Sequence, residues 1–302
     1  MRIGVSLAAG PGPDPLGRLT EQVRQAAGDG FASGWLSNIF GADALTALAV
    51  AGRGTDGIEL GTAVMPTYPR HPAALAQQAL TAAAALAGRL TLGVGPSHKI
   101  VIEDMFGYSF GRPLRHLREY LAILRPLLDG QPADFTGETM SGHVTLSIPV
   151  PGRVPLLLAA LAPRMLRLAG EQADGTILWM TGPATVASHV VPTITAAAEA
   201  AGRPAPRVVC ILPVCVTSDP AAARERAARV FAMYGDLPSY RAMLDREGAA
   251  GPADVAIVGD EKTAGAALTR LAEAGVTDFV AGEYARGEEA VRTREFLRSR
   301  LE

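Results

Sequence analysis

The amino-acid sequence predicts an α/β protein with a (β/α)8 TIM barrel, and three observations lead to this fold class. Eight short apolar segments alternate with helical segments along the chain, which is the order that a parallel barrel requires. The 302 residues are 48% hydrophobic and 19% charged, and barrels commonly use such a length as one domain. No second domain is visible, and no internal repeat exists beyond the alternation itself. We therefore expect one domain over residues 1–302.

Short runs of Val, Ile, Leu and Ala predict the strands because buried parallel strands are apolar on both faces. They are expected at residues 2–7, 32–37, 58–64, 90–94, 154–160, 175–179, 208–217 and 276–281. Apolar residues at helical spacing predict the helices. These are expected at residues 16–27, 42–51, 72–87, 114–128, 163–172, 184–201, 221–247 with a break at Pro238, 262–274 and 288–301.

The stretch 58–98 shows the strand-helix-strand unit most clearly. Prolines between Pro66 and Pro72 delay the helix, and proline is tolerated in a first helical turn. The helix is rich in Ala and Leu and ends at Gly88. A second strand then leads into Gly95-Pro96-Ser97-His98. Such crossovers bring both carboxyl ends to one rim, where ligands bind in parallel α/β folds.

Two segments depart from the repeating unit. Residues 97–111 predict a long loop. Residues 129–151 contain Gly and Pro with alternating Val144, Leu146 and Ile148, a pattern that indicates a short hairpin excursion.

Composition and charge exclude several classes of protein. The net charge of −2 offers no electrostatic basis for nucleic-acid binding. The amino terminus enters a strand at once, and no run reaches the about 18 apolar residues of a membrane span. We expect a soluble, cytoplasmic protein. Cys210 and Cys215 lie five apart in one strand, so they point to opposite faces and should remain free thiols.

The expected rim carries few charged residues, and common catalytic motifs are absent. Neither a metal-binding His spacing nor a GxSxG nucleophile motif occurs. Gly93-x-Gly95 lacks the third glycine of a dinucleotide fingerprint, and Pro96 would remove a backbone amide from such a turn. No P-loop lysine is present, and we expect no metal. Such a rim suits a cofactor that carries its own reactivity.

Four stretches resemble the luciferase-like monooxygenase superfamily, and within it the coenzyme F420-dependent oxidoreductases. They are LGTAVMPTYPRHPAALAQQ, GRLTLGVGPSH, FGYSFGRPLRHLREYLAILRPLL and PLLLAALAPRMLRLAGEQADGTILWM. The resemblance runs over nearly the whole chain. It implies a TIM barrel that binds coenzyme F420, or alternatively FMN, at its carboxyl rim, usually as a homodimer. It also implies a non-prolyl cis peptide between Ala63 and Val64.

Site residues follow from the same resemblance. His98 and Asn38 are the catalytic candidates. Residues that would bind the cofactor are Ser6, Asn38, Ala63, Val64, Met65, Gly95, Pro96, Ser97, His98, Ala160, Leu161, Ala162, Pro163, Arg164 and Trp179.

Each role has a structural alternative. Arg164 would bind the cofactor phosphate at a helix start, or be a solvated arginine. His98 would transfer a proton, or be an ordinary loop histidine. Trp179 would line the substrate cavity or only pack.

Two positions differ from the pattern of the family, and several other polar residues have their own interpretations. Some relatives have a histidine at Asn38 and a glutamate at His98, which argues against copying their mechanism. His71 is interpreted as a helix cap or a cofactor contact, Asp174 as structural, and the pair Glu103 and Asp104 as a solvated face.

The sequence therefore predicts hydride transfer between deazaflavin C5 and a small substrate with an activated C=C, C=N or C=O bond. An F420H2-dependent reductase is the main hypothesis. An FMN-dependent monooxygenase and a non-catalytic flavin-binding barrel are the alternatives. We expect a small-molecule substrate, no nucleic acid, no membrane and a homodimer.

Overall fold

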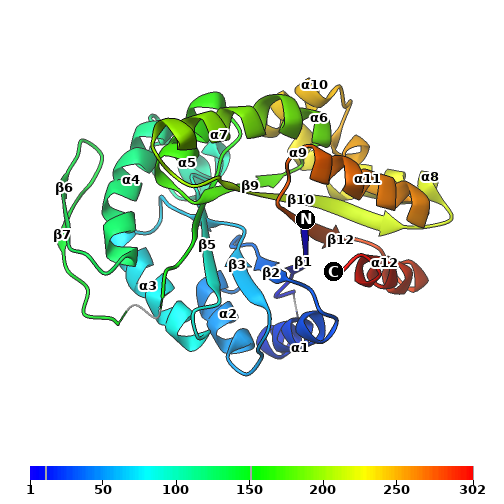
Figure 1. Cartoon of the computed structure of the whole chain (residues 1–302), viewed down its shortest axis with the longest axis horizontal. Helices are drawn as coiled ribbons and strands as arrows, with labels where there is room; N and C mark the ends of the chain where they lie inside the picture. The colour runs from blue at the N-terminus through cyan, green and yellow to red at the C-terminus, as the bar shows by residue number, and fades with distance from the viewer. Residues whose placement is uncertain (11, 150–151, 302) are drawn as a thin grey trace. The chain divides into compact units, whose positions relative to one another are not determined.

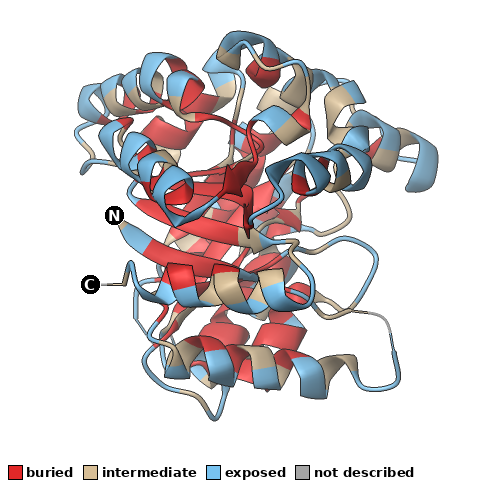
Figure 2. Ribbon diagram, turned by 90° about the vertical axis from the view of Figure 1, so that its right-hand side faces the viewer, coloured by how far each residue is buried: buried red, intermediate tan, exposed pale blue. Residues whose placement is uncertain are grey.

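The computed structural model describes residues 1–10, 12–149 and 152–301. The chain divides into two compact units. Unit 1 comprises Met1–Ser6, Gly28–Gly34 and Ala160–Glu302, and unit 2 comprises Leu7–Ala27 and Trp35–Ala159. Figure 2 shows that buried residues follow the strands and one side of most helices. This is the burial expected of parallel strands covered by amphipathic helices.

Unit 2 contains parallel strands and the helices that follow them in the chain. Its strands are β3 (Glu59–Thr62), β4 (Met65–Pro66), β5 (Leu90–Gly95) and β8 (Leu156–Ala159). Its helices are α1 (Pro15–Gly28), α2 (Ala44–Gly52), α3 (Pro72–Ala85) and α4 (Pro113–Leu128). β5 lies between β3 and β8 and pairs in parallel with both. Strand β2 (Ser33–Leu36) begins in unit 1 and ends in unit 2.

Unit 1 is built in the same way around a long central strand, β10 (Arg207–Val216). β10 pairs in parallel with β9, β11 and β12, and β1 pairs in parallel with β12. These strands are β1 (Arg2–Leu7), β9 (Gly175–Trp179), β11 (Ile257–Gly259) and β12 (Asp278–Glu283). The helical elements are α5 (Pro163–Gln172), α6 (Pro183–Thr185), η2 (Val186–Val190), α7 (Val191–Ala200), α8 (Pro220–Val230), α9 (Ala232–Asp236), α10 (Pro238–Glu247), η3 (Pro252–Asp254), α11 (Glu261–Glu273) and α12 (Glu288–Arg298). Helices α5 and α7 lie side by side (Figure 1).

Side-chain caps define several helix starts. Asp43 accepts a hydrogen bond from the Thr46 amide at the start of α2, and Asp260 does the same for Thr263 at α11. Such caps satisfy amides that have no partner within the helix. The predicted starts of these helices therefore shift by only one or two residues.

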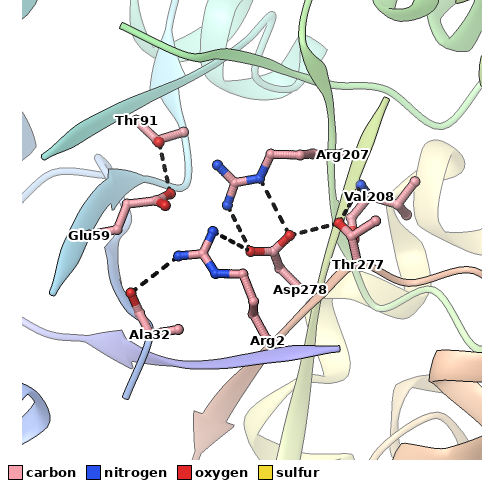
Figure 3. A network of polar contacts seen from close by, with 8 residues as sticks. All are labelled: Arg2, Ala32, Glu59, Thr91, Arg207, Val208, Thr277 and Asp278. Carbon is pink, nitrogen blue, oxygen red and sulfur yellow. Dashed lines mark hydrogen bonds and ion pairs between the residues drawn. The ribbon is translucent and has the colours of Figure 1, made fainter. Parts of the chain in front are cut away.

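A polar network holds the amino ends of β1, β10 and β12 (Figure 3). The side chain of Asp278 is only 3% exposed and binds Arg207 at 2.7 Å and Arg2 at 3.2 Å. The hydroxyl of Thr277 donates to the second oxygen of Asp278 at 2.7 Å. Because a buried carboxylate is costly unless it is paired, this network ties three strands together at their starts.

Most predicted elements are confirmed, but several details were wrong. Residues 97–111 are not only a loop, since they contain a π-helical segment, η1 (Ile100–Met105). The predicted helix 221–247 breaks at Pro238 as expected, but also at Phe231. β4 and β11 were not predicted because runs of two and three residues are too short to show a period.

The predicted hairpin is present as antiparallel β6 (Ala133–Thr136) and β7 (Ser141–Val144). It projects beside α4 (Figure 1). Leu146 and Ile148 follow β7 and do not extend it, which corrects the predicted alternation. Residues 150 and 151 of the predicted excursion lie outside the described residues.

Three further observations bear on composition. Cys210 and Cys215 are buried free thiols, as predicted. Across the described residues, every helix is too short or too polar to cross a membrane. The same residues contain no group of three His, Cys, Asp or Glu side chains placed to hold a metal ion.

Candidate functional site

The carboxyl end of β3 carries a bulge in unit 2. Leu60 and Gly61 pair with Leu90 and Thr91, whereas Met65 and Pro66 pair with Val94 and Gly95, so β4 continues in a register shifted by one residue. The Thr62 hydroxyl fills the gap, since it donates to the Gly93 carbonyl at 2.8 Å and accepts from the Gly93 amide at 2.9 Å. Bulges of this kind redirect side chains beside active sites.

The bulge contains the residues that the resemblance singled out. The peptide bond between Ala63 and Val64 is cis, as the resemblance implied. Both residues are half-buried. A Cβ atom added to Gly95 would lie 3.0 Å from the Val64 side chain and 3.0 Å from the Ala159 Cβ. The side chain of Val64 therefore packs over the glycine that ends β5.

His98 lies just beyond β5. It follows Ser97, whose φ of 63° lies in the left-handed region and is uncommon for a residue other than glycine. The His98 carbonyl accepts hydrogen bonds from the amides of Val101 and Ile102, both at 3.0 Å. Its side chain is half-buried, and this burial lowers the pKa of the imidazole. Because the ring is neutral near pH 7, it can accept a proton directly.

Asn38 has a defined structural contact. Its side-chain oxygen accepts a hydrogen bond from the Ala44 amide at 2.9 Å, at the start of α2. The side chain therefore orders the loop between β2 and α2.

In unit 1, the predicted phosphate-binding residues lie at the start of α5. Ala162 is the N-cap residue and makes no side-chain capping bond, so the first amides of this helix lack the usual side-chain acceptor. Arg164 is exposed in the first turn. The Leu161 carbonyl accepts from the buried His189 ring at 2.8 Å, which fixes the segment before the helix.

The remaining predicted residues of unit 1 lie at the ends of β1 and β9. Ser6 is exposed. Trp179 is half-buried and meets the rings of Phe231 and Tyr234 edge-on at 5.7 and 5.6 Å. Trp179 therefore belongs to an aromatic cluster. The predicted roles of Ser6 and Trp179 at the site stay hypotheses.

A cluster around His116 was missed by the sequence reasoning. His116 on α4 is buried, and its Nε2 lies 2.9 Å from the Thr67 hydroxyl. The ring of Tyr68 stacks on it at 3.9 Å with an angle of 7° between the planes. Burial lowers the pKa of His116 to about 4, while the nearby Glu119 carboxylate opposes the change. Burial also raises the pKa of Tyr68 to about 12, with Glu103 adding to the shift.

This cluster fixes the loop after β4 against β5, because the Thr67 amide also donates to the Gly95 carbonyl at 3.0 Å. A sequence signal existed, since His116 and Tyr120 are four apart and flank the apolar stripe of α4. That spacing showed which face they share but not which residues they contact.

Other polar residues of unit 2 have structural roles. His71 caps α3, where its Nδ1 accepts from the Ala73 amide at 3.2 Å and its Nε2 donates to the Ser141 carbonyl at 3.0 Å. This confirms the interpretation of His71 as a cap. Glu103 is not simply a solvated face, since its carboxylate accepts from the Phe110 amide at 3.0 Å and lies 3.6 Å from Lys99.

Asp174 in unit 1 binds Arg203 at 3.0 Å, in agreement with a structural role. In unit 2, Glu119 accepts hydrogen bonds from the amides of Glu138, Thr139 and Met140. Burial raises the pKa of Glu119, but hydrogen bonds from the Thr139 hydroxyl and from the Thr139 and Met140 amides, together with Arg115, outweigh burial and hold the pKa below its usual value. Both carboxylates therefore have structural partners.

Comparison with a solved structure shows the fold. The coenzyme F420 dependent tetrahydromethanopterin reductase from Methanopyrus kandleri has a TM-score of 0.83 and 22% identity to this chain, with 99% of this chain and 98% of that chain covered. At this level the likeness shows the fold, which is an eight-stranded parallel (β/α)8 barrel as predicted.

Sequence comparison then shows the family. The family model described as Luciferase-like monooxygenase matches residues 1–294. The 5,10-methylenetetrahydromethanopterin reductase of Methanolobus tindarius is 29% identical over 238 residues, which cover 78% of this chain and 72% of the relative. A putative coenzyme F420-dependent oxidoreductase of Mycobacterium tuberculosis is 33% identical over 189 residues, which cover 58% and 54%. The chain belongs to the luciferase-like monooxygenase family and is an enzyme of that family.

Proposed function

We propose that this enzyme is a coenzyme F420-dependent oxidoreductase that transfers a hydride between deazaflavin C5 and a small organic substrate. The substrate carries an activated C=C, C=N or C=O bond, and the physiological direction is reduction by F420H2. The relatives whose names state F420 dependence support the cofactor. The observation that carries the proposal is the register shift between β3 and β5, because it presents Ala63 and Val64 at the carboxyl end of a strand.

The residues of unit 2 fit a planar ring system. The half-buried Val64 side chain, which packs over the buried Gly95, gives the bulge an apolar surface, which suits the face of a ring better than a charged group. Bound deazaflavin supplies two-electron hydride chemistry, so the protein has to bind and orient the cofactor and the substrate and to transfer a proton. We assign contacts with the ring to Ala63, Val64 and Met65 and to Gly95, Pro96, Ser97 and His98.

Proton handling is assigned to a ring nitrogen of His98. Burial lowers the pKa of His98, so the neutral imidazole is the main form near pH 7. In the reducing direction the ring must first take a proton from water and then deliver it to the substrate. Asn38 is assigned a positioning role, since its side-chain oxygen already holds the start of α2.

The start of α5 is assigned to the anionic tail of the cofactor. The helix begins at Ala162 and Pro163 without a side-chain cap, and Arg164 lies in its first turn. Backbone amides and the helix dipole at such an end favour an anion. Ala160 and Leu161 lead into this turn, and Ser6 is the last but one residue of β1. Trp179 is proposed to contact the substrate.

Side-by-side titration with oxidised F420 and with FMN tests the cofactor. Micromolar F420 binding, about −8 kcal/mol, with weaker FMN binding is expected. Equal or tighter FMN binding would move the chain to the monooxygenase hypothesis. Cofactor binding with no turnover of any activated alkene, imine or carbonyl would favour a non-catalytic flavin-binding barrel.

The bulge itself can be tested with Gly95→Ala. The added Cβ would lie 3.0 Å from the Val64 side chain, so it should displace Val64 and weaken F420 binding roughly tenfold. Gly54→Ala is the control, because a Cβ there meets nothing within 4 Å. Unchanged F420 affinity in Gly95→Ala would remove the bulge from the proposed binding surface.

A homodimer is proposed as the working form. Unit 2 has a groove of about 670 Å³ lined by residues of α2 and α3, both apolar, including Leu45, Ala49 and Ala74, and polar, including Thr46, Gln77 and Gln78. Val50 borders it and is 53% exposed. Small and apolar side chains allow close packing of helices from a second copy. Light scattering should show a dimer that Val50→Arg dissociates, and a monomer at all concentrations would contradict this.

The cytoplasmic location stays a prediction.

A further inference from the structure

Two segments of unit 2 that lie far apart in the sequence expose large apolar side chains and meet at one aromatic pair. We call these exposed residues the apolar lip, and its members are Ile39 and Phe40 in one segment and Ile100, Met105, Phe106 and Tyr108 in the other. Phe40 is 61% exposed and Phe106 is 40% exposed. Their ring centroids are 6.1 Å apart at an angle of 57°, so the two loops meet through this aromatic pair. Clustered exposed apolar side chains mark binding surfaces far more often than scattered ones.

Contacts within unit 2 hold the segment that contains η1 and four members of the lip. Ile102 of η1 is fully buried beneath it. The Glu103 carboxylate accepts from the Phe110 amide at 3.0 Å and so closes the segment on itself. The ring of Phe110 lies 5.4 Å from that of Tyr68, which is stacked on the buried His116. Because the loop is held at both ends, it can bind a ligand with a reduced cost of ordering.

Both segments of the lip directly follow residues of the proposed site in the chain. Asn38 directly precedes Ile39 and Phe40 in the loop after β2. The carbonyl of His98 accepts from the amides of Val101 and Ile102 and so begins the turn that carries Met105 and Phe106. Each half of the lip therefore starts at a residue assigned to the reaction. A π-helical segment such as η1 is itself a feature that is frequent at functional sites.

We propose that the apolar lip binds a neutral, ring-bearing part of the substrate while the reducible bond lies at His98. This inference rests on the proposed function and adds the substrate class: activated alkenes, imines or carbonyls that carry an aromatic or alicyclic substituent. Phe40 and Phe106 offer ring faces and edges to such a group. For an enone, the hydride adds to the β carbon and a proton adds to the α carbon. The C=C bond becomes a single bond, and the reduced deazaflavin is oxidised by two electrons.

The test compares two enones that differ only at the β substituent, benzylideneacetone with a phenyl group and ethylideneacetone with a methyl group. Their binding to the cofactor-loaded protein is measured by equilibrium dialysis, which does not require turnover. F420 affinity is measured separately from the fluorescence of the deazaflavin. The variants are Phe106→Ala and Phe40→Ala, with Val291→Ala on α12 as a control at another apolar position, which is 60% exposed.

The wild-type protein is expected to bind the phenyl probe at least tenfold more tightly than the methyl probe. Each Phe→Ala variant should weaken the phenyl probe about tenfold, change the methyl probe less than twofold and leave F420 affinity intact. Phe106→Leu should restore part of the affinity, since it retains apolar contact. Val291→Ala should behave as the wild type.

Three results would overturn the inference. The first is equal binding of both probes by the wild type, and the second is an equal loss for both probes in the variants. The third is light scattering that shows a wild-type dimer dissociated by Phe106→Ala, which would assign the lip to an interface between copies. If the wild type does not bind F420 but the cofactor-free protein still prefers the phenyl probe, the proposed cofactor is rejected and the lip is not.

Discussion

The buried His116 should make the folded protein sensitive to mild acid. In the folded chain burial lowers its pKa from 6.5 to about 4. As the pH falls through this window, the unfolded chain takes up a proton that the folded chain excludes. Stability is therefore complete above about pH 6.5 and decreases toward pH 4.

The size of the effect follows from the two pKa values. A tenfold change in proton affinity corresponds to about 1.4 kcal/mol, so full exclusion of the proton would cost the fold about 2 kcal/mol at pH 5. Because 8% of the His116 surface is still exposed to solvent, roughly half of this, about 1 kcal/mol, is expected.

His116→Gln isolates the contribution, since Gln can still hydrogen-bond to the Thr67 hydroxyl but does not titrate. The free energy of unfolding is measured in urea at pH 7 and pH 5. The wild type should lose about 1 kcal/mol more than His116→Gln over this interval. Thr67→Val is the matched control, because it removes the partner of Nε2, retains the imidazole and should retain the pH dependence. Identical pH dependence in the wild type and His116→Gln would refute the reasoning.

Three further predictions concern the ends of the strands. Asp278→Asn should destabilise the protein by about 2 to 3 kcal/mol, because it leaves the guanidinium groups of Arg2 and Arg207 without the carboxylate that pairs with them. Asp134→Asn, at a carboxylate that is 89% exposed, should cost less than about 0.5 kcal/mol, and similar losses in the two variants would contradict this. His98→Gln should retain cofactor and melting temperature but lower turnover by about 10²- to 10⁴-fold. The wild-type reduction rate should rise as the pH falls toward the lowered pKa of His98, and full activity of the variant would exclude proton transfer. Arg164→Ala should raise the F420 dissociation constant roughly ten- to a hundredfold, whereas unchanged affinity in titration would leave Arg164 a surface residue.

Local sequence patterns determined the order and type of the main elements. The strand at residues 175–179 and the helix at residues 163–172 have the predicted bounds. Proline positions predicted where α3 and α10 begin. These features depend on backbone preferences and on burial periodicity within a few residues, and a single sequence carries that information directly.

The family resemblance also singled out residues that follow two of the strands. It pointed to Ala63, Val64 and His98, and the structure places all three at the ends of β3 and β5 in unit 2. Asn38 and His71 were named as well, but their hydrogen bonds to Ala44, Ala73 and Ser141 were not foreseeable. A motif specifies a position in the chain, whereas a hydrogen bond depends on the partner that folding brings to it.

Only the tertiary structure decided the contacts between distant segments. The register shift at β4 depends on how two strands align, and the Thr62 hydroxyl that fills it looks like any other threonine in the sequence. His116 meets Thr67 across 49 residues, and Phe106 meets Phe40 across an even longer separation. Propensity and spacing act within one segment, while burial, stacking and the lowered pKa of His116 arise from side chains of other segments that surround it in the folded protein.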